Sequence, residues 1–165
     1  MKKDLYLGAA YYPELWEEEE IEKDIARIRE VGLNCVRIGE FAWGRMESQE
    51  SVFDFEWLKR AVEKLYEKGI YTVLCTPSAT PPRWLLNKYP ETRMVMHDLV
   101  RADVSSRCHT CKTSPVMREK NRIIVTKMAE TFAGRPGVIG WQIDNEIYPY
   151  NEGCFCENCK AAFRM

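Results

Sequence analysis

The hydrophobic and polar positions of this chain form two alternating patterns. Short runs rich in β-branched and aromatic residues have the length and continuity of buried strands. They occupy residues 5–10, 34–38, 70–75 and 138–146. In the segments between them, apolar residues recur every three or four positions, which is typical of one face of a helix. Helices are therefore expected at residues 18–31, 55–68, about 83–88, 115 to about 132 and 157–165.

The regular succession of strands and helices predicts a parallel α/β sheet. Gly32 and Gly69 follow the first two helices as stops, and Pro115 suits the first turn of a later helix. An eight-stranded barrel needs about 200–250 residues, so a chain of 165 residues would supply about four of its β/α units. The alternative is a complete, small doubly wound domain. A nucleotide-binding fold is not supported, because no glycine-rich phosphate loop follows any strand.

The composition excludes several classes of protein. Apolar residues make up 45% and charged residues 30% of the chain, and 24 basic against 25 acidic residues give a net charge of −1. This balance provides neither a basic field for nucleic acid nor a polybasic membrane anchor. No apolar run approaches the roughly 18 residues of a membrane helix, and the first residues do not resemble a signal peptide. We expect a cytoplasmic protein.

Polar and aromatic side chains gather where the predicted strands end. Glu146 closes the run VIGWQIDNE, and a carboxylate at the carboxyl end of a parallel strand occupies the position where barrel enzymes keep their chemistry. Taken alone, Glu146 is as well explained as a solvated loop residue. Aromatic residues beside carboxylates and amides suit a sugar, although core packing is the more frequent explanation for each of Trp43, Trp84 and Trp141.

Cleavage of a glycoside typically uses two carboxylic residues, one of them a general acid. Glu146 is the candidate acid, and the Asn145 amide could hold the hydroxyl next to the reacting carbon. A retaining mechanism needs a second carboxylate about 5–5.5 Å away. Glu40 and Glu14 are available, but both are expected to bind or brace. For Arg37, within a strand, an ion-pairing brace and a ligand contact are equally good explanations.

The seven cysteines are unusual for a chain expected in a reducing compartment, where such clusters indicate a metal more often than disulfides. Four thiolates would make a closed structural zinc site. Two sets of four fit the spacing. One is ribbon-like and consists of Cys108, Cys111, Cys156 and Cys159, and the other consists of Cys111, Cys154, Cys156 and Cys159. The remaining Cys35 and Cys75 lie within strand patterns and are interpreted as small buried hydrophobic residues.

Six longer stretches carry a resemblance to one known family. They are AAYYPELW (9–16), NCVRIGEFAWGRMESQESVFDFEWL (34–58), TPSATPPRWL (76–85), SRCHTCKTSPVMRE (106–119), GWQIDNE (140–146) and CFCENCKAAFR (154–164). Together they resemble the β-galactosidases of glycoside hydrolase family 42, which are built on a (β/α)₈ TIM barrel. The resemblance runs from about residue 7 to the last residue, in the order of the family.

The resemblance implies a role for individual residues. Glu146 would be the general acid/base, Asn145 a ligand of a sugar hydroxyl, and Arg37 and Arg107 contacts to galactose. A structural Zn²⁺ would be bound by the second cysteine set, Cys111, Cys154, Cys156 and Cys159. The family's nucleophile is a glutamate at the end of the seventh strand, beyond the four strands expected here.

Residues 1–165 are therefore expected to form the amino-terminal half of a TIM-barrel glycosidase domain, truncated at its C-terminus. The intact enzyme would be a retaining β-galactosidase that releases terminal non-reducing β-D-galactose and assembles as a homo-oligomer, a trimer in this family. The portion alone is expected to be inactive. Two alternatives remain open, namely a zinc-stapled carbohydrate-binding or interaction module without catalysis, and a barrel glycosidase for another sugar.

Overall fold

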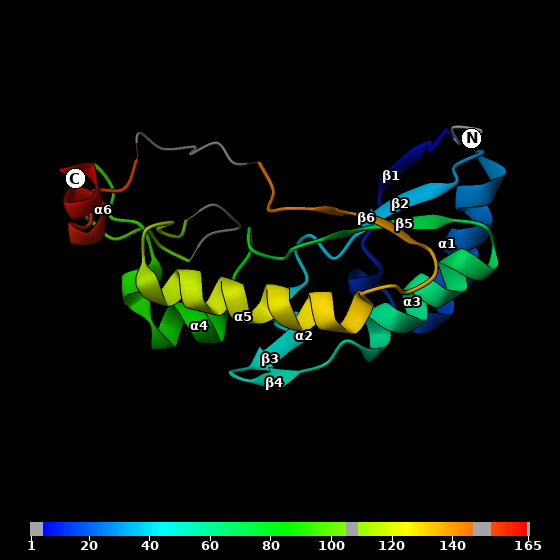
Figure 1. Ribbon diagram of the computed structural model, residues 1–165, viewed down its shortest axis with the longest axis horizontal. Coiled ribbons are helices and arrows are strands. Elements are labelled where there is room, and N and C mark those ends of the chain that lie inside the picture. The colour runs from blue at the N-terminus through cyan, green and yellow to red at the C-terminus, as the bar shows by residue number, and fades with distance from the viewer. Residues whose placement is uncertain (1–4, 105–108, 147–152, 165) are drawn as a thin grey trace.

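A sheet of four parallel strands forms the centre of the computed structural model, which describes residues 5–104, 109–146 and 153–164 (Figure 1). The strands lie in the order β1 (Gly8–Ala10), β2 (Cys35–Ile38), β5 (Tyr71–Cys75) and β6 (Val138–Gln142). Because the four parallel strands lie side by side in chain order, the sheet has the winding of a barrel, whereas a doubly wound sheet reverses its order. The predicted fold class is confirmed.

Three long helices connect these strands and lie on the same side of the sheet (Figure 1). They are α1 (Glu18–Glu30), α3 (Glu56–Glu67) and α5 (Pro115–Phe132). Helix α5 begins at a cap, because the Ser114 side chain accepts a hydrogen bond from the backbone N–H of Met117. The apolar faces of the helices pack against the strands in one core that includes Ile25, Ile38, Leu58, Leu74 and Ile124.

The turn from α5 into β6 requires a glycine. Gly137 has φ +87°, a left-handed conformation that side chains rarely adopt. A Cβ atom at this position would lie 2.7 Å from Cβ of Tyr66 on α3, which is closer than packed carbon atoms approach. The glycine thus allows β6 to enter the sheet directly beside α3.

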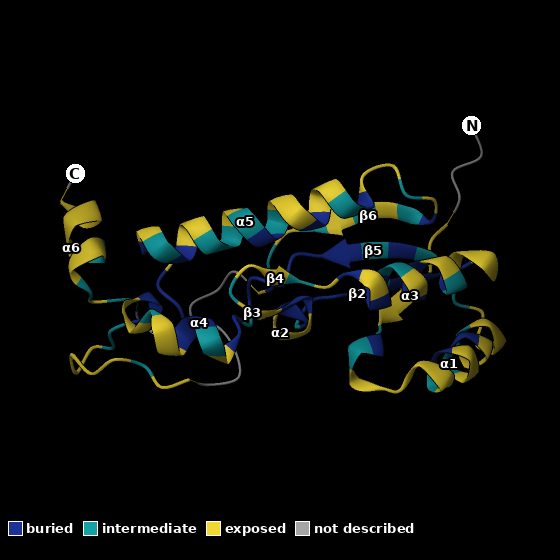
Figure 2. Ribbon diagram, turned by 90° about the horizontal axis from the view of Figure 1, so that it is seen from below, coloured by how far each residue is buried: buried dark blue, intermediate teal, exposed yellow. Residues whose placement is uncertain are grey.

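The fourth strand differs from its prediction. The sequence predicts a strand over residues 138–146 packed on both faces, but β6 ends at Gln142 and leaves Ile139 39% and Trp141 37% exposed. Figure 2 shows the contrast with β5, which is largely buried. The physical reason is position, because β6 is an edge strand of the described sheet and has a strand neighbour on one side only.

Smaller elements lie in the connections. After β2 come α2 (Trp43–Met46) and an antiparallel hairpin of β3 (Glu47–Gln49) and β4 (Val52–Phe53), all of which the hydrophobic pattern missed. Short 3₁₀ helices cover Pro13–Leu15 and Pro90–Thr92, and the expected helix α4 covers Arg83–Lys88. The last helix, α6 (Glu157–Phe163), lies at the opposite end of the molecule from α1 (Figure 1).

One carboxylate attaches the hairpin to two helices. Glu50, at the hairpin turn, pairs with Lys88 on α4 and with Lys120 on α5, and it accepts a hydrogen bond of 2.8 Å from the Tyr89 hydroxyl. These contacts lower the pKa of Glu50 to about 2, the hydrogen bond from Lys120 being the largest cause. The hairpin is therefore held by charge pairs as well as by Trp43, which is fully buried in the core as expected.

Within the three described ranges, no helix is long and apolar enough to cross a membrane.

Candidate active site and cysteine cluster

The candidate active site lies at the carboxyl ends of β2, β5 and β6. Arg37, near the end of β2, extends its guanidinium past β5 and donates from Nη1 to Oε1 of Gln142 on β6, at 2.5 Å. Its Nη2 lies 2.7 Å from Oε2 of Glu40. The Arg37 side chain remains 33% exposed, whereas that of Glu40 is 3% exposed. Arg37 is therefore an ion-pairing brace in this structure, and its partly open side leaves room for a ligand contact as well.

Glu40 is held in place by its contacts with Arg37 and with a second residue. Its Oε2 atom also lies 3.4 Å from the Tyr12 hydroxyl, which donates to it. Burial raises the pKa of Tyr12, and the charge of Glu40 raises it further. Burial likewise raises the pKa of Glu14, which lies two residues after Tyr12. Glu40 thus braces Arg37, as the sequence suggests, whereas Oε2 of Glu14 is buried without a hydrogen-bond partner among the described residues.

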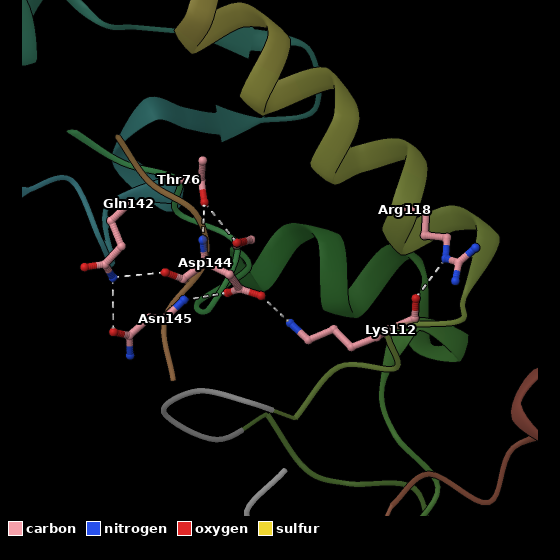
Figure 3. A network of polar contacts seen from close by, with 7 residues as sticks. Thr76, Lys112, Arg118, Gln142, Asp144 and Asn145 are labelled. Carbon is pink, nitrogen blue, oxygen red and sulfur yellow. Dashed lines mark hydrogen bonds and ion pairs between the residues drawn. The ribbon is translucent and has the colours of Figure 1, made fainter. Parts of the chain in front are cut away.

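The chain turns sharply where β6 ends. Asp144 has φ 57° and Glu146 has φ 45°, both in the left-handed region that is uncommon for residues other than glycine. The backbone N–H of Asp144 donates to Oγ1 of Thr76 at 2.7 Å, and its carbonyl accepts from Nε2 of Gln142 at 2.9 Å (Figure 3). The end of β6 is therefore fastened to the loop after β5 while it presents Asn145 and Glu146.

The Asn145 side chain is buried, and only one of its two polar atoms forms a hydrogen bond among the described residues. Its side chain is 7% exposed, and Oδ1 accepts a hydrogen bond of 3.4 Å from Nε2 of Gln142. Its Nδ2 atom is buried and finds no hydrogen-bond acceptor among the described residues. A buried donor without an acceptor is destabilising, so the amide calls for a structural or functional explanation. An oxygen from a ligand is the simplest partner for this amide.

Glu146, next to Asn145, is exposed at the end of the turn. The predicted ligand residue Arg107 and the alternative metal ligand Cys108 both lie outside the described residues. The structure therefore brings three of the four predicted catalytic and sugar-binding residues to one edge of the sheet, namely Arg37, Asn145 and Glu146.

Asp144 is a charged member of this edge. Its Oδ1 accepts the backbone N–H of Asn145 at 2.9 Å, and its Oδ2 lies 3.0 Å from Nζ of Lys112 (Figure 3). Burial alone would raise the pKa of Asp144, but the hydrogen bond from Asn145 and the Lys112 ammonium outweigh it, and the pKa is lowered. Asp144 thus stays a carboxylate that bonds the residue directly before Glu146.

Four cysteines converge beyond this edge. The Sγ atoms of Cys111, Cys154, Cys156 and Cys159 all lie within 4.8 Å of one another. Cys111 lies 3.5 Å from each of Cys156 and Cys159. Four sulfurs at 2.3 Å from a tetrahedrally coordinated zinc would be about 3.8 Å apart, so the spacing suits a metal ion of this kind. The cluster could hold a metal, and it connects the loop before α5 to α6.

The thiols of the cluster differ from one another, since burial raises the pKa of Cys154 and raises that of Cys159 to about 12. Cys156 caps α6 and accepts the backbone N–H of Cys159, which together with the neighbouring thiols outweighs burial and lowers its pKa to about 7. Cys35 and Cys75 are buried in β2 and β5, as their strand pattern predicts. Burial raises the pKa of both, that of Cys75 to about 12.

Besides Asp144 and Lys112, the sequence analysis gave no role to Gln142 and Thr76. Gln142 links Arg37 to Asn145, and Thr76 receives the Asp144 N–H. A signal for Gln142 exists, because it is the one polar side chain within the apolar stretch VIGWQI and lies two residues from Gly140, on the same face of β6. Thr76 carries no comparable signal, since a threonine after a strand is ordinary turn chemistry.

Comparisons with known proteins point in one direction. The family model of glycoside hydrolase 42, described as β-galactosidase, matches residues 10–165. The β-galactosidase YesZ of Bacillus subtilis is 46% identical over 160 residues, which are 95% of this chain and 24% of that protein. A β-galactosidase of Thermus thermophilus is 44% identical over 159 residues, which are 96% of this chain and 25% of that protein.

Solved structures agree with the sequence relatives. The β-galactosidase of the Antarctic haloarchaeon Halorubrum lacusprofundi superposes with a TM-score of 0.92 at 42% identity, covering 97% of this chain and 24% of that one. That of Bacillus circulans superposes with a TM-score of 0.91 at 30% identity, covering 96% and 23%. The chain thus spans about a quarter of the length of the relatives that it matches.

Proposed function

The chain belongs to glycoside hydrolase family 42, and we propose that it supplies the acid/base portion of a retaining β-galactosidase. The substrate is a terminal non-reducing β-D-galactose residue, and Glu146 is the general acid/base. The proposal extends to this chain the activity by which its relatives from Bacillus subtilis and Thermus thermophilus are named. The second carboxylate of the site comes from outside these 165 residues.

One observation carries the proposal. Beside Glu146, at the carboxyl end of β6, the buried Nδ2 of Asn145 has no acceptor among the residues that the structure describes. A sugar hydroxyl supplies such an acceptor, and its arrival would remove the penalty of an unpaired buried donor. The amide and the carboxylate are adjacent in the chain at the same end of β6, which supports a sugar that is held by Asn145 and protonated by Glu146.

The chemistry assigns two proton transfers to Glu146. As the bond between the anomeric carbon and the glycosidic oxygen breaks, Glu146 gives its proton to the leaving oxygen, while the second carboxylate bonds the anomeric carbon. Glu146 then takes a proton from water, which displaces that carboxylate and releases galactose. Arg37, and Arg107 outside the described residues, contact the galactose hydroxyls. Glu40 does not replace the second carboxylate, because its pairing with Arg37 occupies it.

We also propose that the cysteine cluster binds one structural Zn²⁺. Four thiolates fill the tetrahedral positions of zinc, so the ion has no open position for substrate or water. When bound, the metal fastens the loop that carries Cys111 to α6. Its chemistry is therefore that of a cross-link, and its loss would affect folding rather than a chemical step.

The thiols are also the basis for proposing a cytoplasmic location. A reducing compartment keeps cysteines available to a metal instead of pairing them as disulfides. The six cysteines that the structure describes are all free. Fractionation of cells that express the chain with a small epitope tag tests this location directly.

The test of the function uses a hybrid enzyme in which this chain replaces the matching part of the Bacillus subtilis relative, so that a complete barrel is assembled. In this hybrid, Glu146→Gln should lower kcat/KM for an alkyl galactoside with a poor leaving group by about 10²–10⁴-fold. An activated aryl galactoside needs no protonation, and its kcat/KM should change little. Glu130→Gln, an exposed glutamate on α5, is the matched control. Wild-type rates on the poor leaving group in the Glu146→Gln hybrid would contradict the assignment.

A further inference from the structure

Asp144 is held at every polar group that it possesses. Its N–H bonds Thr76, its carbonyl accepts from Gln142, and its two carboxylate oxygens bond the Asn145 N–H and the Lys112 ammonium (Figure 3). Its φ of 57° is a strained conformation, and such conformations persist where the surroundings fix them by several contacts at once. Asp144 therefore determines the backbone direction at Asn145 and Glu146.

Lys112 approaches Asp144 from a different part of the molecule. It follows Cys111 of the cysteine cluster directly, and its carbonyl accepts a hydrogen bond of 2.9 Å from Nε of Arg118 on α5. The lysine backbone is thus anchored between the cluster and α5, while its side chain extends to the end of β6 (Figure 3). Among the described residues, no strand pairing joins the loop of Lys112 to the end of β6. The ion pair of 3.0 Å between Lys112 and Asp144 joins them.

We infer that Lys112 and Asp144 are positioning residues, whose ion pair sets the direction of Glu146 by fixing the turn before it from the cysteine-cluster loop. The inference rests on the proposed acid/base role of Glu146. Neither residue needs to touch the sugar. Asp144 acts through the Asn145 backbone N–H, and Lys112 acts through the carboxylate of Asp144.

The solvent exposure of the Lys112 and Asp144 side chains distinguishes a positioning role from a merely stabilising one. The Lys112 side chain is 52% exposed and that of Asp144 is 18% exposed, and ion pairs so open to water contribute little to the stability of a fold. Loss of the lysine should therefore leave the molecule folded. Proton transfer depends much more steeply on geometry, because a small misplacement of a reacting group slows an enzyme strongly.

Lys160 offers a matched control. Like Lys112, it directly follows a cysteine of the cluster, it is 45% exposed, and it pairs with a carboxylate, Glu157, at 2.7 Å. That pair lies within α6 and does not involve the end of β6. Lys112→Met and Lys160→Met thus remove the same charge beside the same cluster, and only the first removes the connection to Asp144.

The kinetic test uses the hybrid enzyme. Lys112→Met should lower kcat/KM for the poor leaving group about tenfold, with little change for the activated aryl galactoside. Lys112→Arg should recover most of the loss, because it restores the cation, and Lys160→Met should have no selective effect. An equal loss on both substrates, or the same loss in Lys160→Met, would overturn the inference. If Glu146→Gln itself has no effect, the proposed function fails instead, which keeps the two failures distinct.

A second readout uses the same hybrid enzyme. The Asn145 amide donates to Asp144, so its hydrogen exchange, measured by mass spectrometry on the peptide that contains it, reports the state of the turn. Lys112→Met should accelerate this exchange while the melting temperature stays the same, and Lys160→Met should not. Unchanged exchange in Lys112→Met would overturn the inference.

Discussion

Arg37 on β2 donates to Gln142 on β6 across the intervening strand β5, with 2.5 Å between Nη1 and Oε1. The same guanidinium neutralises the buried Glu40. One side chain thus links the carboxyl ends of β2 and β6 at the edge of the sheet where Asn145 and Glu146 emerge. This relationship makes Arg37 important for the fold as well as for the proposed sugar site.

Replacing Arg37 should therefore destabilise the chain. Arg37→Met leaves Glu40 buried without its cation, which we expect to cost about 3 kcal/mol in the free energy of unfolding, the lower end of the range for buried pairs because the Arg37 side chain is 33% exposed. Urea denaturation of the purified chain measures this loss. Arg37→Met combined with Glu40→Gln removes the unpaired charge and should recover part of it. Equal losses in the single and double variants would show that the ion pair is not the cause.

The hairpin should respond to acid through Glu50. Its pKa of about 2 lies below the ordinary value of 4.5, so the carboxylate is stabilised in the folded state. A group with a lowered folded pKa contributes stability above pH 4.5, and this contribution is lost as the pH falls from 4.5 towards 2. Glu50→Gln should flatten the fall of the urea midpoint over this range. The exposed Glu67→Gln is the control, and identical profiles in both variants would contradict the prediction.

Metal analysis should find about one zinc per chain. Cys154→Ser and Cys156→Ser should lower the zinc content and the melting temperature, because each removes one of four ligands. Cys75→Ser, in the buried strand β5, should retain the metal. Cys108→Ser distinguishes the two cysteine sets that the spacing allows. Loss of zinc in Cys108→Ser with retention in Cys154→Ser would favour the ribbon-like set instead.

The isolated chain should be a poor enzyme that self-associates. Within the described sheet, β1 and β6 are edge strands, and β6 exposes Ile139 and Trp141. Edges of this kind pair readily with other chains. Light scattering after gel filtration, combined with hydrolysis of an aryl β-galactoside, tests both parts. Robust turnover by a monodisperse monomer would show that the site is complete within these residues.

Much of the fold could be predicted from hydrophobic periodicity. The helix expected at residues 18–31 is observed as Glu18–Glu30, and the helix expected from 115 to about 132 as Pro115–Phe132. The β3–β4 hairpin was missed because its sequence is short and polar, and its position depends on Glu50 reaching Lys88 and Lys120, far away in the sequence. Such contacts leave no local pattern.

The site was predictable in its residue types but not in its contacts. Strand ends located Arg37, Asn145 and Glu146, whereas the choice between a brace and a ligand contact for Arg37 required the positions of Glu40 and Gln142. The prediction extended the fourth strand too far, because the apolar Ile143 continues its hydrophobic pattern. The left-handed φ of 57° at Asp144, which ends the extended backbone, leaves no such signal in the sequence. Cysteine spacing allowed two ligand sets, and the resemblance to the family favoured Cys111, Cys154, Cys156 and Cys159, whose sulfurs lie within 4.8 Å of one another.

Azide rescue of the Glu146→Gln hybrid tests the central claim most directly. With an activated aryl galactoside, the galactosyl group reaches the second carboxylate without acid help, and water then reacts slowly because its base is missing. Azide needs no base, so it should attack the anomeric carbon, displace that carboxylate and restore turnover. The account predicts accumulation of β-galactosyl azide in this variant and not in the Glu130→Gln control. Absence of this product, with undiminished hydrolysis in water, would contradict the assignment of Glu146 as the acid/base.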